Sequence, residues 1–240
     1  MKIALISDVH SNLEALQTCF EYIDSNNDIE KTIFLGDLIG YGADPDNCIL
    51  LVKEKTDSGI IGNHDCAVIE KTDIEYFNSF ALEAVFWTRN NISEESRTFL
   101  ISLPYTLNDN GTLFVHGTPG NPEIWDYILN WQSASLEFDN FEENICFVGH
   151  SHVPGIYSSE NKIQHDSGVV ELNRDDKYII NVGSVGQPRD GDPKLSFGIF
   201  DTDTWTIEII RLEYDIETAG KKIINAGLPD ALCKRLFRGR

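Results

Sequence analysis

The 240-residue sequence predicts an α/β fold in which two mixed β-sheets pack face to face between layers of helices. In the first half, short apolar segments alternate with helical patterns, which is typical of a partly parallel sheet with helices on its faces. In the second half, short apolar segments are separated by turn-forming residues, which is typical of β-hairpins. We expect residues 1–240 to form a single domain.

The first half predicts strands that each end in a polar motif. Residues 2–6 are an apolar strand, followed by a helical pattern over residues 12–23. A second strand, residues 32–35, precedes a helix over residues 45–52 that carries a proline in its first turn. A third short strand ends at residues 60–61. These alternations favour parallel pairing of the three strands.

The helical spacing of apolar residues over 77–103 predicts two helices with a break near Asn90-Asn91. Clusters such as Asn173-Arg174-Asp175-Asp176 mark turns between the later strands. The strands expected there are residues 112–115, 145–148, 155–157, 169–172, 178–180, 196–200 and 205–210. This part of the chain is therefore predicted to consist mostly of hairpins.

The end of the chain differs from the rest in charge. Residues 221–240 carry six basic side chains and one acid. We expect a solvated terminal helix or tail whose cations complement the helix dipole. Docking against an acidic neighbouring subunit or an anionic ligand is the alternative.

The overall charge narrows the classes of partner. The chain has 19 Lys and Arg against 39 Asp and Glu, a formal net charge of −20. Binding to a nucleic-acid polymer depends on basic side chains that displace counterions, so such a partner is not expected. Because 41% of the residues are hydrophobic, the charge does not signal disorder.

The sequence favours a cytoplasmic protein without a membrane segment. No window reaches the roughly 18 consecutive apolar residues of a membrane-spanning helix. The apolar run at residues 1–6 is too short for a signal peptide. The cysteines are odd in number and widely spaced, which favours reduced thiols over disulfides or zinc fingers. They are Cys19, Cys48, Cys66, Cys146 and Cys233.

The histidines are the most informative residues. Five of the six occur in short motifs that directly follow an apolar strand, and His165 is the exception. The motifs are Asp8-Val9-His10, Asn63-His64-Asp65, His116-Gly117 and His150-Ser151-His152, and Gly36-Asp37 has the same placement. Because strand ends deliver side chains to one crevice at the edge of a sheet, we expect these residues to converge.

The residue types in these motifs predict a metal centre. Carboxylates, an amide and imidazoles without thiolates suit Mn²⁺, Fe, Zn²⁺ or Co²⁺. The seven candidate ligands are Asp8, His10, Asp37, Asn63, His116, His150 and His152. They outnumber the ligands that one ion needs, so two ions bridged by one carboxylate is the economical arrangement. Each residue alone could be structural, but the joint placement of five histidines argues against that.

Five motifs carry a resemblance to a known family, and they occur in that family's order. They are Asp8-Val9-His10, Gly36-Asp37-Leu38-Ile39-Gly40-Tyr41-Gly42, Gly62-Asn63-His64-Asp65, Val115-His116-Gly117 and Gly149-His150-Ser151-His152. On these motifs the sequence resembles the calcineurin-like metallophosphoesterases over roughly residues 2–200. The resemblance implies a four-layer α/β/β/α sandwich with a dinuclear metal centre at the sheet edge. It assigns Asp8, His10, Asp37 and His152 to one ion, and Asp37, Asn63, His116 and His150 to the other.

Two further segments are similar to a small prokaryotic phosphodiesterase branch of that family. They are residues 40–45 and residues 181–193. Some members of this branch are labelled diadenosine-tetraphosphate hydrolases or cyclic-nucleotide phosphodiesterases. The protein phosphatases of the superfamily carry an Asp-Arg-Gly motif where this chain has Gly40-Tyr41-Gly42, so protein phosphatase activity is not expected.

The resemblance implies a metal-dependent hydrolase of small phosphate esters, preferably phosphodiesters or nucleotide-type substrates. Two divalent ions, Mn²⁺ first and Fe, Zn, Co or Ni as alternatives, would activate a hydroxide that attacks phosphorus. Phosphomonoesters and dinucleoside polyphosphates are alternative substrates. A non-catalytic protein-binding scaffold is the alternative of another class, although His64 and every metal position are present. A homo-oligomer is possible within this family.

Other residues have roles that the sequence leaves more open. In the family, the histidine that matches His64 donates a proton to the leaving oxygen or stabilises charge there. Asp65 could be its hydrogen-bond partner or could serve only a turn. Arg189 could bind the substrate phosphate or pair with a neighbouring aspartate. Tyr41 could stack on a base, shape the pocket mouth or only pack its loop.

Substrate specificity is expected from loops around residues 41–47, 66–80, 118–132 and 184–193. One of these loops carries Trp125, Tyr127 and Trp131, which could stack on a nucleobase. The alternative for these aromatic residues is a place in the core or in a dimer contact.

Overall fold

The computed structural model describes residues 1–160 and 168–240. His165, the histidine outside the motifs, is not among them. Within these two ranges, every helix is too short or too polar to cross a membrane.

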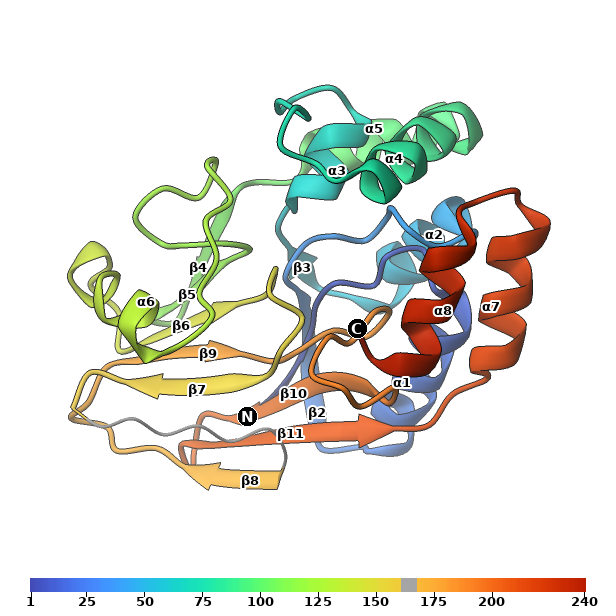
Figure 1. Cartoon of the computed structure of the whole chain (residues 1–240). Coiled ribbons are helices and arrows are strands. Elements are labelled where there is room, and N and C mark those ends of the chain that lie inside the picture. Colours follow the sequence, from blue (N-terminus) through green and yellow to red (C-terminus); the bar gives the residue numbers. More distant parts are fainter. Residues whose placement is uncertain (161–167) are drawn as a thin grey trace.

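A six-stranded sheet joins the two ends of the chain (Figure 1). It consists of β1 (Lys2–Ile6), β2 (Ile29–Phe34), β3 (Ser58–Gly59), β8 (Gly168–Glu171), β10 (Leu195–Asp201) and β11 (Thr206–Leu212). Their order is β3-β2-β1-β10-β11-β8. The first three strands are parallel, as the sequence predicts, whereas β1 pairs antiparallel with β10. The sheet is therefore mixed.

A five-stranded sheet packs against it. Its strands are β4 (Thr106–Asp109), β5 (Thr112–Val115), β6 (Ile145–Val148), β7 (Gly155–Ser158) and β9 (Tyr178–Asn181), in the order β4-β5-β6-β9-β7. The pairs β5–β6 and β6–β9 are parallel, so the prediction that this half consists mostly of hairpins is wrong. All residues of β6 and β9 are buried, which is typical of central parallel strands.

The helices are α1 (Leu13–Ser25), α2 (Pro45–Lys55), α3 (Asn63–Val68), α4 (Ser79–Asn91), α5 (Glu94–Ser102), α6 (Trp131–Ser135), α7 (Ile216–Asn225) and α8 (Asp230–Arg238), with a 3₁₀ turn at Phe138–Asn140. The predicted break between two helices near Asn90-Asn91 is confirmed, and Ser93 caps α5 by accepting a hydrogen bond from the Ser96 amide. The C-terminal segment forms two helices rather than the one predicted. The turn between them contains Gly227 at a φ of 74°.

The hydrophobic core has three layers, which define the four-layer arrangement that the sequence predicts. Leu16 and Phe20 of α1 pack on the outer face of the six-stranded sheet. Leu5 of that sheet and Phe147 of the other lie in the core between the sheets. Phe138 helps to cover the opposite face of the five-stranded sheet. The predicted fold class is confirmed, although the outermost helical layer on this side is short.

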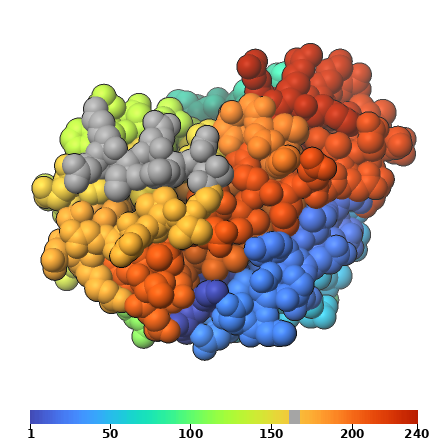
Figure 2. Space-filling model, turned by 90° about the horizontal axis from the view of Figure 1, so that it is seen from below, coloured from blue at the N-terminus to red at the C-terminus, as the bar shows by residue number. Residues whose placement is uncertain are grey.

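Segments far apart in the sequence lie side by side on one face of the molecule. Figure 2 shows the N-terminal residues, in dark blue, next to the orange β10–β11 region. The Met1 ammonium donates a hydrogen bond to Asp203 Oδ2 at 2.7 Å. This contact adds to the pairing of β1 with β10, and the carboxyl end of β1 leads into the first histidine motif.

Candidate metal centre

The polar motifs follow the carboxyl ends of parallel strands in both sheets. Asp8 and His10 follow β1, Asp37 follows β2, and His116 follows β5. His150 and His152 follow β6, and Asn63 begins α3 just beyond β3. The two packed sheets therefore deliver all the motifs to one edge, as the sequence predicts.

The backbone of these loops is strained where the candidate ligands lie. Asp8, His10, Asp37, His150 and His152 all have positive φ, between 49° and 66°. This region is uncommon for residues with a side chain and costs of order 1–3 kcal/mol each, so it persists only where surrounding contacts enforce it. Gly62 lies so close to Asp37 that a Cβ atom there would be 2.1 Å from Asp37 Oδ1. The loops are shaped around these side chains.

The structure gathers six ionisable side chains into two groups that share one residue, and we call them the His/Asp cluster. The groups are Asp8, His10, Asp37 and His152, and Asp37, His116 and His150. Within each group the candidate ligand atoms lie within 4.8 Å of one another, and all six residues are buried. Asp37 belongs to both groups, which is the position that a bridging carboxylate would need.

Each of the four imidazoles in the cluster is oriented by a backbone carbonyl. Nδ1 of His10, His116 and His152 lies 3.1, 2.7 and 2.6 Å from the carbonyl oxygens of Ile39, Leu35 and Gln187. In His150 it is Nε2 that lies 2.8 Å from a carbonyl oxygen, that of Trp125. Because a carbonyl oxygen only accepts, these ring nitrogens are the donors. In each ring that is neutral, the opposite nitrogen therefore carries a lone pair that can bind a metal ion.

Those lone pairs lie next to one another and to carboxylates. His10 Nε2 is 3.1 Å from His152 Nε2, so two acceptors face each other. His152 Nε2 is 3.2 Å from Asp8 Oδ1, and His116 Nε2 is 3.3 Å from Asp37 Oδ2. Such an arrangement is unfavourable in a buried site unless a cation binds to it.

Buried polar atoms without hydrogen bonds give an independent indication of a metal site. Asp37 Oδ2, His116 Nε2 and Asn63 Oδ1 have no hydrogen-bond partner among the described residues. Such orphaned atoms are rare in folded proteins. Together the donor set of imidazoles, carboxylates and one amide oxygen fits divalent Mn, Fe, Zn or Co.

Burial sets the protonation of three of the four imidazoles. It lowers the pKa of His10 and His152 well below the ordinary value, and it lowers the pKa of His150 to about 3. These rings are neutral near pH 7, which is the state that binds metal. Burial would lower the pKa of His116, but the Asp37 carboxylate beside it raises that pKa to about 9 in the absence of a bound metal ion. Burial alone would raise the pKa of Asp37, but the neighbouring histidines, His116 foremost, hold it well below the ordinary value. Asp37 therefore carries a negative charge at neutral pH.

Two serines that the sequence analysis missed support Asp8. Ser7 Oγ donates to Asp8 Oδ2 at 2.6 Å, and Ser184 Oγ donates to the Asp8 carbonyl at 2.8 Å. The His150 amide also donates to the Asp8 carboxylate. Ser7 directly precedes the first motif, so its position could have been noticed. Ser184 comes from a distant loop, and no local pattern places it here.

His64 lies beside the His/Asp cluster. Its amide donates to Asp37 Oδ1 at 2.8 Å, and its ring packs against those of His10, Tyr41 and Phe77. Nδ1 is buried next to Gly40 and has no partner among the residues described. Asp65 accepts hydrogen bonds from the Gly62 and Ile39 amides. Asp65 therefore stabilises the turn and is not the hydrogen-bond partner of the His64 ring.

Arg189 and Tyr41 lie against each other at the edge of the cluster. Arg189 donates to Gln187 Oε1 at 3.2 Å and to the Tyr41 hydroxyl at 3.4 Å. Its neighbours Asp190 and Asp192 form ion pairs with Arg211. Arg189 therefore does not form the ion pair with a neighbouring aspartate that was the alternative to phosphate binding. The Tyr41 ring lies 4.7 Å from that of His10. Tyr41 is buried and packs against α7 and α8.

A cleft of about 590 Å³ opens next to the cluster, with Asn63, His64 and His150 among its lining residues. Tyr41 and segments 72–81 and 123–127 line the rest, which agrees with three of the four loops expected to set specificity. Trp125 and Tyr127 line the cleft. Trp131 begins α6, packs in the outer core layer and donates to the Ser158 carbonyl, so it does not belong with them.

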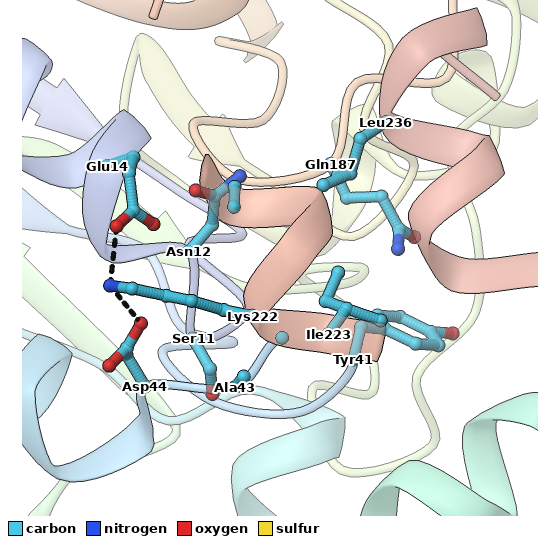
Figure 3. A pocket seen from close by; sticks show the side chains of 12 residues that line it. Ser11, Asn12, Glu14, Tyr41, Ala43, Asp44, Gln187, Lys222, Ile223 and Leu236 are labelled. Atoms are coloured by element: carbon cyan, nitrogen blue, oxygen red, sulfur yellow. Dashed lines mark hydrogen bonds and ion pairs between the residues drawn. The ribbon is translucent and has the colours of Figure 1, made fainter. Parts of the chain in front are cut away.

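A second charged cluster lies where α7 packs on the loops that follow β1 and β2 (Figure 3). Lys222 Nζ is 2.5 Å from Glu14 Oε1 and 2.8 Å from Asp44 Oδ2. We call these three residues the Lys222 cluster. The expectation of a solvated basic terminal helix is thus wrong for Lys222, because it pairs with acids of the same chain.

Comparison with known proteins agrees with this architecture. The family profile described as the calcineurin-like phosphoesterase superfamily domain matches residues 1–205. An uncharacterized protein of Methanocaldococcus jannaschii is 43% identical over 99% of this chain and 98% of its own length. A metallophosphoesterase of Sphaerobacter thermophilus has a similar crystal structure, with a TM-score of 0.89, 38% identity, and coverage of 100% of this chain and 99% of that one. A hypothetical protein of Pyrococcus horikoshii shares the fold, with a TM-score of 0.83, 20% identity, and coverage of 100% and 98%.

Proposed function

The chain belongs to the calcineurin-like phosphoesterase superfamily, and from this premise we propose that it hydrolyses small phosphodiesters with two bound divalent cations. The observation that carries the proposal is the orientation of the four imidazoles. Each donates one N–H to a backbone carbonyl, and Nε2 of His10, His116 and His152 lies 3.2 to 3.6 Å from the carboxylate of Asp8 or Asp37. That arrangement is suited to holding cations.

In this proposal, Asp8, His10, Asp37 and His152 hold one ion, and Asp37, Asn63, His116 and His150 hold the other. The two groups around the shared Asp37 support this division. When bound, two such cations supply a nucleophile at neutral pH and neutralise the charge of the phosphate. The donor set, which contains no thiolate, fits Fe, Zn and Co as well, and Mn²⁺ is the cation we propose to test first.

The residues around the cluster would position the ester and its leaving group. His64 lines the cleft, and its Nδ1 is buried against Gly40, so we assign proton donation to the leaving oxygen to Nε2. Arg189 has a planar guanidinium suited to two phosphate oxygens. Tyr41 would orient that guanidinium, because its hydroxyl accepts from Arg189.

A diester fits the site better than a monoester because the cleft beside the cluster has room for a second substituent on phosphorus. The test compares bis-p-nitrophenyl phosphate with p-nitrophenyl phosphate in the presence of Mn²⁺. The diester should be the better substrate. Equal or faster turnover of the monoester would reject the diester preference, and the absence of metal-dependent turnover of either would favour a protein-binding scaffold.

A reduced compartment such as the cytoplasm is part of the proposal. All five cysteines are free thiols, and burial raises the pKa of Cys19 well above its ordinary value. A thiol count by Ellman's reagent under denaturing, non-reducing conditions checks this for protein purified without reductant. Five reactive thiols per chain are expected.

A further inference from the structure

The cleft next to the His/Asp cluster has an unusual combination of aromatic walls and acidic side chains. Of its two long walls, one comes from residues 72–81 and the other from residues 123–127. Trp125 Nε1 donates to Thr72 Oγ1 at 3.1 Å and ties the walls together. The Trp125 carbonyl also accepts from His150 Nε2, so this residue links the cleft to the candidate metal centre.

Aromatic rings are available on both walls. Tyr127 stacks on His150 with ring centroids 3.9 Å apart and remains 47% exposed. Tyr76, from the opposite wall, is 93% exposed. Exposed aromatic side chains in a cleft are typical of ligand sites, because their faces bind planar groups and cations.

The charges of the lining favour a cation over other ligands. Asp73, Glu123 and Asp126 line the cleft, and the lining contains neither lysine nor arginine among the described residues. A polyphosphate chain would be repelled there. A nucleobase could stack on Tyr127, but as a neutral group it gains no Coulomb attraction from three carboxylates. An alkylammonium group gains both from the aromatic faces and from the carboxylates.

The inner end of the cleft opens onto the candidate metal centre. Asn63 and His64 are more than nine-tenths buried, and both line this end. Asn63 Oδ1, a candidate ligand of the metal centre, has no hydrogen-bond partner within the described part of the chain. A phosphate placed at this end would leave its substituent in the aromatic and acidic part.

Building on the phosphodiesterase function, we propose that the cleft binds an alkylammonium substituent of the substrate. The preferred substrates are then zwitterionic phosphodiesters with a choline-like or ethanolamine-like group. The phosphate lies at the His/Asp cluster and the cation lies between the walls that carry Tyr76 and Tyr127.

Matched esters test this proposal with the full-length protein and Mn²⁺. The esters are p-nitrophenyl phosphorylcholine, its uncharged carbon isostere 3,3-dimethylbutyl p-nitrophenyl phosphate, and p-nitrophenyl thymidine 5′-phosphate. All three release p-nitrophenolate, so kcat/KM reports the substituent. We expect the choline ester to exceed the isostere by about tenfold, mainly through KM, and to exceed the thymidine ester. Equal values for ester and isostere, or a preference for thymidine, would overturn the proposal.

Two variants and one control test whether the residues of the cleft cause the preference for the choline ester over the isostere. Asp126→Asn and Tyr127→Leu should each reduce the ratio of the choline ester to the isostere by about two- to threefold. Glu142→Gln removes an exposed carboxylate that does not line the cleft, and its ratio should equal that of the wild type. A ratio unchanged in both cleft variants would contradict the assignment to these walls.

A binding measurement separates this inference from the proposed function. Isothermal titration with phosphocholine and with 3,3-dimethylbutyl phosphate requires no turnover. If none of the esters is hydrolysed but phosphocholine binds about tenfold more tightly, the function fails and the ammonium site stands. If the esters are hydrolysed but the two ligands bind equally, the ammonium site is rejected and the function stands.

Discussion

The Lys222 cluster and the His/Asp cluster both hold charged side chains close to Tyr41, but only one is complete without a ligand. In the Lys222 cluster the cation contacts both acids, and only about 10 Å³ of free space remains in the pocket there. In the His/Asp cluster, atoms of Asp37 and His116 lack hydrogen bonds within the described residues. Facing acceptors at His10 and His152 add to the imbalance.

This difference separates a structural contact from a binding site. Burying a charged group costs free energy unless the group is paired. Unpaired buried groups in loops with a strained backbone therefore indicate a site that binds a ligand from outside the chain. The sequence is rich in acids near both clusters, and composition alone does not distinguish them. The distinction lies in which polar atoms find partners after folding.

The largest effect is expected from Asp37→Asn, which acts on the residue common to both groups of the His/Asp cluster. The variant should lose both ions and at least about a thousandfold in phosphodiester turnover. Elemental analysis gives the metal content per chain, and bis-p-nitrophenyl phosphate gives the rate. Asp44→Asn makes the same change in the Lys222 cluster and should keep both ions. An Asp37→Asn protein that retains two ions would refute the shared position.

His64→Ala should leave the metal content intact while slowing hydrolysis by about 10²- to 10⁴-fold. The reason is that His64 lines the cleft beside the cluster but belongs to neither group of candidate ligands. The loss should be greater for an alkyl leaving group than for p-nitrophenolate, because a good leaving group needs less proton donation. A fall in metal content would instead make His64 a ligand.

Arg189→Ala should raise KM for phosphodiesters by about tenfold with both ions retained. Arg189 contacts Tyr41 and Gln187, and the neighbouring aspartates pair with Arg211, so the guanidinium is not occupied by an acid of its own loop. Arg189→Lys keeps the charge without the planar fork and should recover only part of the affinity. Unchanged KM and kcat in Arg189→Ala would remove Arg189 from the substrate site.

The fold class and the convergence of the motifs could be predicted because they depend on local patterns. Asp8, Asp37, His116 and His150 each follow an apolar strand, so they are expected to meet at one edge of the sheets. This expectation does not depend on how the remaining strands pair. The turn-forming residues between the later strands suggest hairpins but do not decide which strands pair, and only the continuous apolar character of β6 and β9 favours their parallel pairing. The roles of Ser184 and Lys222 depend on loop and helix packing over long sequence separations, which no local spacing encodes.

The smallest effect is expected in the Lys222 cluster, where Lys222→Met should reduce stability by about 1–2 kcal/mol. The loss leaves Glu14 and Asp44 without their cation, and it is moderate because Lys222 is 35% exposed. Lys222→Arg should recover part of it. Urea unfolding of metal-free protein measures the change, and added Mn²⁺ should stabilise the wild type and Lys222→Met equally, since the ions bind elsewhere. If Lys222→Met abolished the stabilisation by Mn²⁺, the two clusters would not be independent, and α7 would have to be counted as part of the metal centre.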